Sequence, residues 1–283
     1  MSKKNPVNIN SENNNQEEKL EYMKMPTEMA TFGINRKVYD WDESHDLSAC
    51  KIFLESIFKQ MENHKVENDN LVFAVVGLDA NNLGYLNALL GEGEVSAVVS
   101  KKNQTINIQE SIFTGIWRVT VFAENQTLVE DYIEVGDIPS VIKITNQTLP
   151  NKLIFNSDLL PENVGNAPAI LTEIKDKRNK YQLDSRHTPE AINLTLLPHT
   201  KEDIGRINDI LGVGNIVILS RGYGNCRISS TGVSSVWWVQ YFNSTDVEIL
   251  NTIEVVDIPI VACAAQEDLQ VSASRLKEFI EEL

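Results

Sequence analysis

The chain is expected to adopt an α+β fold made of two copies of one unit, a helix followed by an antiparallel β-meander. The main reason is a recurrence: residues 82–139 return about 120 positions later, with NLGYLNALLGEGEV in the first copy and DIGRINDILGVGNI in the second. Both copies then run through a tryptophan-containing segment to the same tripeptide, DIP. Duplicated units usually pack like a homodimer, so a pseudo-symmetric arrangement is expected. Amphipathic helices are expected before the first copy and at the C-terminus.

The first 70 residues are expected to hold a tail, an arm and one helix. Residues 1–25 are rich in Asn, Glu and Lys and poor in apolar residues, which predicts a disordered tail. Residues 26–70 form the expected N-terminal arm and helix. Apolar residues recur with helical spacing over 46–63, and Cys50 lies on that apolar stripe. Packing in the core is therefore the expected role of Cys50.

Residues 71–149 are expected to form the first copy. The apolar run at 71–78 predicts a buried strand or an extended segment. Asp79 is a suitable N-cap for a helix over 81–90 that ends at Gly91. Alternating runs then predict the four strands of the meander, at 94–100, 105–111, 115–123 and 128–136. Links as short as these favour an antiparallel meander with one apolar face covered by helices.

Residues 150–190 are expected to be a helical connector, with a helix from about 167 to 180 after an Asn-Ala-Pro start. Residues 191–283 are expected to form the second copy and the C-terminal helix. Thr200 is the expected N-cap of a helix over 201–211. The strands of this copy are expected at 215–220, 225–230, 234–242 and 247–255, and the last helix at 266–283.

The charge of the chain bears on its partners. The net charge of −15 argues against nucleic acid and anionic membrane surfaces, which attract clustered Lys and Arg. It suits a basic protein partner, although ordinary solubility explains it equally well. The N-terminal segment has no apolar stretch like that of a signal peptide, and no run approaches 18 apolar residues. With three cysteines and no CxxC motif, a cytoplasmic protein with free thiols is expected.

The two copies differ most at residues 220–231, SRGYGNCRISST, which correspond to SKKNQTINIQES in the first copy. A Gly-Tyr-Gly turn in the second copy permits positive φ angles and close approach by another chain or ligand. Trp237–Trp238 replaces Trp117–Arg118. Because neighbouring residues of a strand face opposite ways, one tryptophan of this pair is expected to face outward or into an interface. Positions shared by both copies are interpreted as scaffold, and these differences as function.

Cys226 takes the position of Ile106, and it can be interpreted in two ways. It is either a small residue buried in a strand, or a thiolate whose pKa is lowered by Arg221 and Arg227. In the second case it could touch a metal cluster or a thiol of a partner. Cys263, which replaces Lys143, is the other cysteine of this copy. Two cysteines are too few for a structural zinc or a four-thiolate iron–sulfur site, so no resident metal is expected.

Sequence motifs of catalysis are missing: the chain contains no HExxH, no GxSxG and no Walker sequence. Its four histidines lie in no known motif. The sequence therefore favours a binding protein over an enzyme.

Several long segments resemble the HupH/HyaF family of hydrogenase expression/formation proteins. They are LLGEGEVSA, IQESIFTGIWRV, ENVGNAPAILTEI, INLTLLPHT, ILSRGYGNCRISST, WWVQYFNS and NTIEVVDIPIVACAAQEDL. The resemblance covers about residues 70–283 and is weakest in the Asn-rich N-terminus. It implies a cytoplasmic accessory factor for an uptake nickel–iron hydrogenase. Such a factor would assist maturation, with the precursor of the iron–sulfur small subunit as its expected client before export.

No set of catalytic residues follows from the resemblance. An acidic chaperone would suit a client with a basic export signal. A client-binding face is therefore expected in the second copy. Its candidate residues are Arg221, Gly222, Tyr223, Gly224, Asn225, Cys226, Arg227, Trp237, Trp238 and Cys263. Two alternatives stay open: a transient iron–sulfur or iron carrier that uses Cys226 and Cys263, and a thiol-dependent enzyme that uses Cys226.

Overall fold

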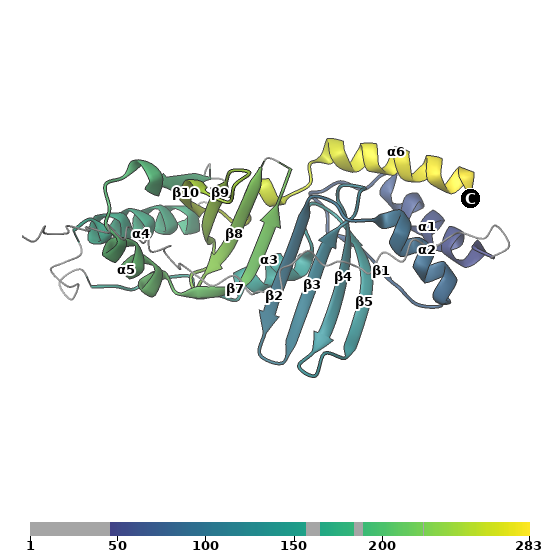
Figure 1. Ribbon diagram of the computed structural model, residues 1–283, viewed down its shortest axis with the longest axis horizontal. Helices are drawn as coiled ribbons and strands as arrows, with labels where there is room; N and C mark the ends of the chain where they lie inside the picture. Colours follow the sequence, from purple (N-terminus) through teal and green to yellow (C-terminus); the bar gives the residue numbers. More distant parts are fainter. Residues whose placement is uncertain (1–45, 157–164, 184–188, 223) are drawn as a thin grey trace, which may run out of the picture. The chain divides into compact units, whose positions relative to one another are not determined.

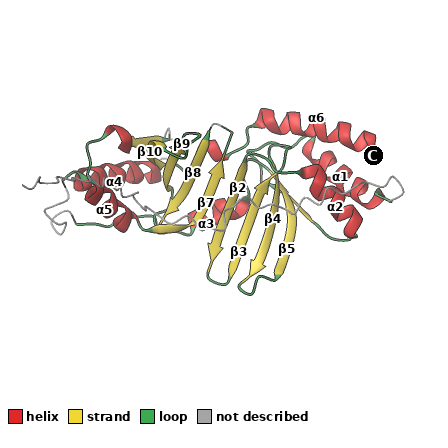
Figure 2. Cartoon of the chain, viewed as in Figure 1, coloured by secondary structure: helices red, strands yellow, loops and turns green. Residues whose placement is uncertain are grey.

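The computed structural model describes residues 46–156, 165–183, 189–222 and 224–283 (Figure 1). The tail expected at 1–25 and the arm at 26–45 lie outside the described residues, as does Tyr223. The described part contains six α-helices and one ten-stranded antiparallel sheet (Figure 2). This confirms the α+β class.

The bounds of the helices are α1 Ser48–Met61, α2 Ala80–Leu90, α3 Ser140–Gln147, α4 Ala167–Leu183, α5 Lys201–Leu211 and α6 Gln266–Glu282. Short 3₁₀ turns η2 and η3 cover Leu194–Leu196 and Ile260–Ala262. The strands of the first half are β1 Leu71–Ala74, β2 Val95–Lys101, β3 Gln104–Glu110, β4 Ile116–Ala123 and β5 Leu128–Val135. Those of the second half are β6 Glu190–Asn193, β7 Val213–Ser220, β8 Asn225–Thr231, β9 Val236–Phe242 and β10 Glu248–Val255.

The sheet runs in the order β1-β5-β4-β3-β2-β7-β8-β9-β10-β6. Its central joint is the antiparallel pair β2–β7, in which Val98 lies opposite Val217. Each half is a meander whose edge strand, β1 or β6, pairs with the last strand of the same half. Within the part of the chain described by the structure, no helix is long and apolar enough to cross a bilayer.

The ends of α2 and α5 follow from local sequence, as expected. The Asp79 side chain accepts a hydrogen bond from the backbone N–H of Asn82, and Thr200 forms a capping box with Asp203. Gly91 and Gly212, with φ of 55° and 69°, end these helices in a conformation that favours glycine.

Two hydrophobic clusters hold the fold together. The first lies on one face of the sheet and extends without a break across the β2–β7 joint, with Val99 and Ile106 on one side and Ile218 and Ile228 on the other. Residues of α3 and η3 cover it. The second cluster joins α1, α2 and α6 to the outer strands of the first half. Figure 1 shows these three helices beside β1 and β5. The C-terminal helix thus packs on the first half of the chain.

Helix α3 was not expected from the sequence, and β1 is shorter than the strand expected at 71–78. The start of α3 depends on a residue from elsewhere in the chain. The buried Glu134 accepts hydrogen bonds at Oε1 from the backbone N–H and the hydroxyl of Ser140, at 2.7 Å and 2.5 Å. A tertiary contact of this kind leaves no trace in local periodicity.

Gly93 and Gly214 occupy equivalent places at the start of β2 and within β7, where another backbone comes very close. The Gly93 N–H donates to Glu110 O at 2.7 Å. A Cβ at Gly93 would overlap the carbonyl oxygen of Ser111, and one at Gly214 would overlap Ser230 and the carbonyl of Thr231. The close approach explains why both halves carry glycine here.

Gly93→Ala is therefore expected to lower the free energy of unfolding by about 2 kcal/mol or more, because the new methyl group must displace backbone. Gly205→Ala is the matched control. A Cβ at Gly205, inside α5, meets nothing within 4 Å, so this change should raise stability by roughly 0.5–1 kcal/mol. Urea denaturation followed by circular dichroism measures both. Equal effects of the two substitutions would contradict the role given to Gly93.

Candidate functional site

The segment singled out by the sequence forms the turn between β7 and β8. Arg221, Gly222, Gly224 and Asn225 are exposed there, and Ser220 lies opposite Cys226 where the two strands pair. Gly224 has a φ of 98°, a value that side chains other than glycine rarely adopt. The turn is thus the exposed part of the predicted face.

A residue of the first half contacts this turn. The backbone N–H of Arg221 donates to the carbonyl oxygen of Glu94 at 3.0 Å. Gly222 leaves room for the Glu94 carboxylate, which a Cβ at that position would overlap. Glu94 of the same chain thus comes close to the turn, whereas the close approach of another chain or a ligand stays a prediction. Arg221 and Glu94 thus bring one positive and one negative side chain to this turn.

Cys226 is a buried core residue, which agrees with the first of its two interpretations and not with a thiolate of lowered pKa. Its side chain is 2% exposed and belongs to the same cluster as Ile106, its counterpart in the first half. Burial raises the pKa of its thiol to about 12, although a hydrogen bond with Tyr241 acts in the opposite direction. Arg227, the next residue on the strand, stacks over the ring of Phe242 at 5.4 Å instead. Neighbouring strand residues point to opposite faces, so this arginine cannot stabilise the thiolate directly.

Trp237 and Trp238 do face opposite ways, but the expectation that one faces outward is wrong. They are 0% and 4% exposed, because both faces of β9 are covered from Val236 to Gln240. Trp238 Nε1 donates to Asn251 Oδ1 at 2.6 Å. The first half has Arg118 and Asp131 at the equivalent places, joined by two hydrogen bonds of 2.5 Å. Trp238 therefore replaces one member of a cross-strand pair and supports the sheet.

Cys263 follows η3 and is partly buried. Burial raises the pKa of its thiol to about 12, and Asp137 adds to this while Lys143 opposes it. In the ranges that the structure describes, no group of three or more His, Cys, Asp and Glu residues is placed to hold a metal ion. Metal ligation and nucleophilic attack both need thiolate. The raised pKa values of Cys226 and Cys263 argue against the carrier and against the thiol-dependent enzyme.

Glu110 is a functional candidate that sequence reasoning missed. It is 3% exposed at the end of β3 and accepts long hydrogen bonds, both 3.3 Å, from the N–H groups of Val95 and Gly115. Burial raises the pKa of its carboxyl to about 7. The equivalent residue of the second half, Ser230, accepts a hydrogen bond from Ile216 at 3.0 Å. The difference between Glu110 and Ser230, at equivalent positions of the two halves, was the signal in the sequence that could have identified this residue.

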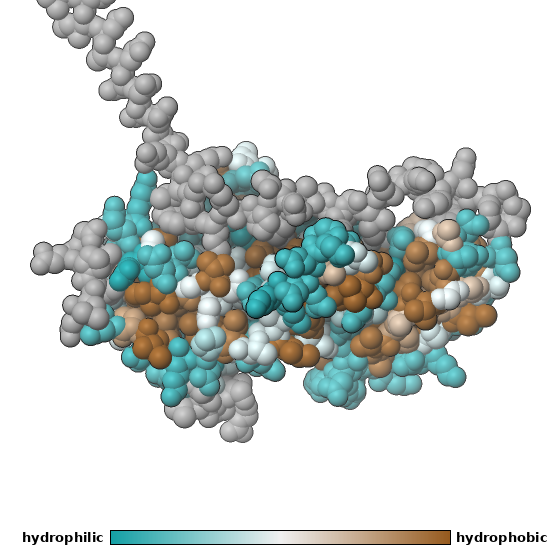
Figure 3. Space-filling model, turned by 90° about the horizontal axis from the view of Figure 1, so that it is seen from below, coloured by the Kyte–Doolittle hydropathy of each residue, from teal (hydrophilic) through white to brown (hydrophobic). Residues whose placement is uncertain are grey.

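A groove of about 760 Å³ between β1, β5 and α3 was also missed. Its lining is mainly apolar, with Val72, Val76, Val129 and Ile144 among the exposed side chains. On the side of the molecule seen in Figure 3, apolar surface gathers in several places between polar regions. The groove joins segments that are distant in sequence, so no local pattern predicts it.

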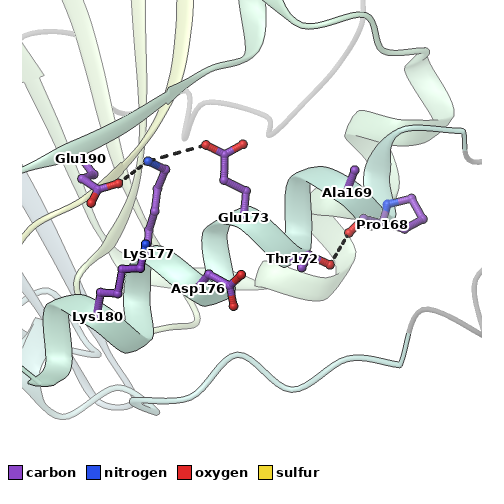
Figure 4. Close-up of a pocket in the computed structure, with 8 residues that line it drawn as sticks. All are labelled: Pro168, Ala169, Thr172, Glu173, Asp176, Lys177, Lys180 and Glu190. Carbon is purple, nitrogen blue, oxygen red and sulfur yellow. Dashed lines mark hydrogen bonds and ion pairs between the residues drawn. The ribbon is translucent and has the colours of Figure 1, made fainter.

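A second hollow, of about 620 Å³, lies along α4 and is lined by charged side chains (Figure 4). Lys177 forms ion pairs with Glu190 and, at 3.6 Å, with Glu173. The hydrogen bond with Glu190 is the main reason that the pKa of Lys177 is raised. Since these charges largely neutralise one another, the hollow has no strong preference for an ion of either sign.

Comparison with known proteins places the chain in a family. A family model described as "HupH hydrogenase expression protein, C-terminal conserved region" matches residues 47–153 and again residues 164–283. The chain belongs to this HupH family. The two matched ranges cover nearly all of the described residues, including the turn at 221–225 and the groove.

Relatives in the HupH family are similar along most of their length. A "Hydrogenase expression/formation protein HoxQ" from Cupriavidus necator is 40% identical over 268 residues, 94% of this chain and 92% of that protein. A "Hydrogenase expression/formation protein HupH" from Rhodobacter capsulatus is 38% identical, over 94% of this chain and 92% of that protein. A "Hydrogenase-1 operon protein HyaF" from Escherichia coli is 34% identical, over 74% of this chain and 72% of that protein.

Proposed function

We propose that this chain is a cytoplasmic accessory factor that assists the maturation of an uptake nickel–iron hydrogenase. Its client is the precursor of the iron–sulfur small subunit, which it binds before export. The observation that carries the proposal is the match of the HupH family model to residues 47–153 and 164–283. The names of the relatives, hydrogenase expression/formation proteins, support it.

Binding without chemistry is the mode of action that fits the described residues best. The thiols with raised pKa values are poor nucleophiles, and the hollow along α4 contains opposed charges. A chain with a net charge of −15 attracts a basic client segment and so speeds its association. The chain therefore acts as a chaperone that holds its client.

The client contacts the exposed turn Arg221–Asn225 of the second half. Two features support this choice: the turn differs between the copies, and Arg221, Gly222, Gly224 and Asn225 are exposed. The other candidates are buried or partly buried, and they are Cys226, Arg227, Trp237, Trp238 and Cys263. Trp237 and Trp238 pair with Ser230 and Ser229, at the end of β8 away from the turn, and they support the sheet.

The two halves of the chain descend from one duplicated unit. Three observations support this part of the proposal. The family model matches two consecutive ranges, and strand order runs outward in the same way from the β2–β7 joint. In addition, Trp117 Nε1 donates to Gly136 O at 3.0 Å, and Trp237 Nε1 donates to the equivalent Val256 O at 3.2 Å. Segments 71–149 and 191–283 are then the two copies, and 150–190 connects them.

The test is co-purification of the small-subunit precursor with the tagged full chain. Arg221→Ala and Tyr223→Ala are expected to reduce capture several-fold, because they shorten side chains on the proposed contact turn. Lys102→Ala changes the equivalent turn of the first half and should leave capture unchanged. The buried Trp238 is unsuitable here, since its removal would disturb the fold. Failure of the unmodified chain to retain the precursor would refute the proposed function.

A further inference from the structure

We propose that the groove between β1, β5 and α3 binds an extended, apolar peptide segment that carries a basic side chain and pairs with the outer edge of β1, the last strand of the described sheet. The proposal rests on the proposed function only for the source of that segment, the small-subunit precursor. The binding chemistry follows from the groove itself.

The groove exposes an unusual amount of apolar surface. Val72 is 61% exposed, Val76 is 73% exposed and Ile144 is 57% exposed. Leu128 and Val129 of β5 are exposed as well and line the same hollow. Single exposed apolar residues need no explanation, but a contiguous set around a concave surface is typical of a binding site.

The groove lies against an open sheet edge. Strand β1 ends the strand order, and among the described residues it pairs only with β5. An edge strand presents unpaired backbone N–H and C=O groups, which natural proteins usually protect with charges, proline or a bulge. β1 has the sequence LVFA, with no charge and no proline, and its short length of four residues is the protection that it does have. An incoming extended segment can therefore continue the sheet and place alternate side chains in the groove.

The walls of the groove are held in place before any segment binds. Glu134, at its floor, is 1% exposed. Besides its bonds to Ser140 at the start of α3, its Oε1 accepts a hydrogen bond from Asn70 Nδ2 at 2.8 Å. The Asn70 amide also donates to the carbonyl oxygen of Ile138 at 2.7 Å. α3 is thus fixed against β5, so binding requires little ordering of the site.

Charge selects a basic occupant over a second copy of this chain. The groove is lined by Lys101 and by three carboxylates. Asp131 is paired with Arg118, and Glu134 is buried among donors, which leaves Lys101 and Glu130 as the exposed charges of the lining. The net charge of −15 then favours a basic segment over an acidic one. A lysine or arginine of the segment would meet Glu130. Two copies joined at their β1 edges would bring like charges together, in chains whose net charge is already −15.

In the described residues, the second half has no helix at the position of α3, which forms one wall of this groove, and so it provides matched controls. Where the first half has α3, the second has only the short turn η3, and Ile260 takes the position of Ser140. Glu254, the counterpart of Glu134, therefore has no serine at this position from which its carboxylate could accept hydrogen bonds. Ile249 of β10 corresponds to Val129 of β5, and the two are similarly exposed, at 57% and 53%. Substitution at Ile249 changes the surface equally without touching the groove.

The first experiment measures peptide binding by the full chain. The probe is a short fluorescent peptide in which valine alternates with threonine and has one central lysine. Fluorescence anisotropy should show saturable binding. Val129→Asp and Ile144→Glu should each weaken it by about tenfold, which corresponds to losing roughly one apolar contact. Ile249→Asp should leave the affinity unchanged. Absence of binding to the unmodified chain, or equal weakening by Ile249→Asp, would overturn the proposal.

A charge exchange tests the choice of a basic segment. Glu130→Lys should weaken binding of the lysine peptide and strengthen binding of an otherwise identical peptide with central glutamate. Insensitivity of both peptides to this substitution would overturn that choice.

The groove variants are then tested for capture of the small-subunit precursor. If the unmodified chain captures the precursor and Val129→Asp does not, the groove and the proposed function are both supported. If all variants capture it equally, the groove is not the client site, although the proposed function stands. If even the unmodified chain captures nothing, the proposed function fails, and the peptide measurements alone decide on the groove.

Discussion

Replacement of Trp237 by alanine is expected to lower the free energy of unfolding by about 3–5 kcal/mol. The side chain is fully buried in the cluster that extends across the β2–β7 joint. Its removal leaves a large cavity among residues of both halves. It also removes the donor to Val256 O and Asp257 O, at 3.2 Å and 3.1 Å. Chemical denaturation followed by tryptophan fluorescence and circular dichroism measures the effect.

Trp117→Ala is the matched substitution in the first half, since Trp117 is 1% exposed in the same cluster. Because one core serves both halves, each substitution should lower a single unfolding transition by a similar amount. Trp237→Phe retains most of the buried ring and should cost clearly less. Two separate transitions in either alanine variant would show that the halves unfold independently and would contradict a shared core.

Glu110→Gln is expected to stabilise the protein at pH 8 and to have little effect at pH 5. The pKa of the Glu110 carboxyl is raised from 4.5 to about 7, mainly by burial, with a smaller contribution from the nearby Glu94. The folded chain therefore holds a proton that the unfolded chain releases at lower pH. The stability linked to this group is fully present below pH 4.5 and is lost as the pH rises through about 7. The shift corresponds to about 3 kcal/mol.

Denaturation midpoints between pH 5 and pH 8 should accordingly fall for the unmodified protein and fall less for Glu110→Gln. Glu94→Gln is the informative control. It removes a charge that raises the pKa of Glu110 in the folded chain, so the decline in stability should be smaller and should end at a lower pH. Parallel pH profiles for all three proteins would show that Glu110 does not titrate in this range.

Local signals predicted much of the fold. Asp79 and Thr200 cap the helices that the sequence assigned to them, because capping depends on residues three positions apart. Alternation of apolar residues found all eight meander strands within a few positions of their ends. Helix α3 escaped prediction because it begins on a carboxylate, Glu134, supplied by a neighbouring strand.

The candidate site was harder to predict than the fold. The alternation of side chains along a strand correctly predicted that Trp237 and Trp238 point to opposite faces of the sheet. It could not show that other parts of the chain cover both faces of β9. Nearby arginines in the sequence suggested a thiolate at Cys226, whereas the strand turns Arg227 away and buries the sulfur. The groove at β1 is formed by side chains from three separated segments. Exposure and concavity are properties of packing, so a pattern along the chain carries little information about them.

The position of α6 in the fold has a consequence for how the chain can fold while it is being translated. Leu269, Ala273, Leu276 and Ile280 complete the cluster formed by α1, α2 and the outer strands of the first half. These residues leave the ribosome only after the whole second half has been translated. Until then the apolar faces of α1 and α2 lack their third layer, so the nascent first half cannot reach its final packing. The packing of the first half thus depends on translation of the second half and of the helix that follows it.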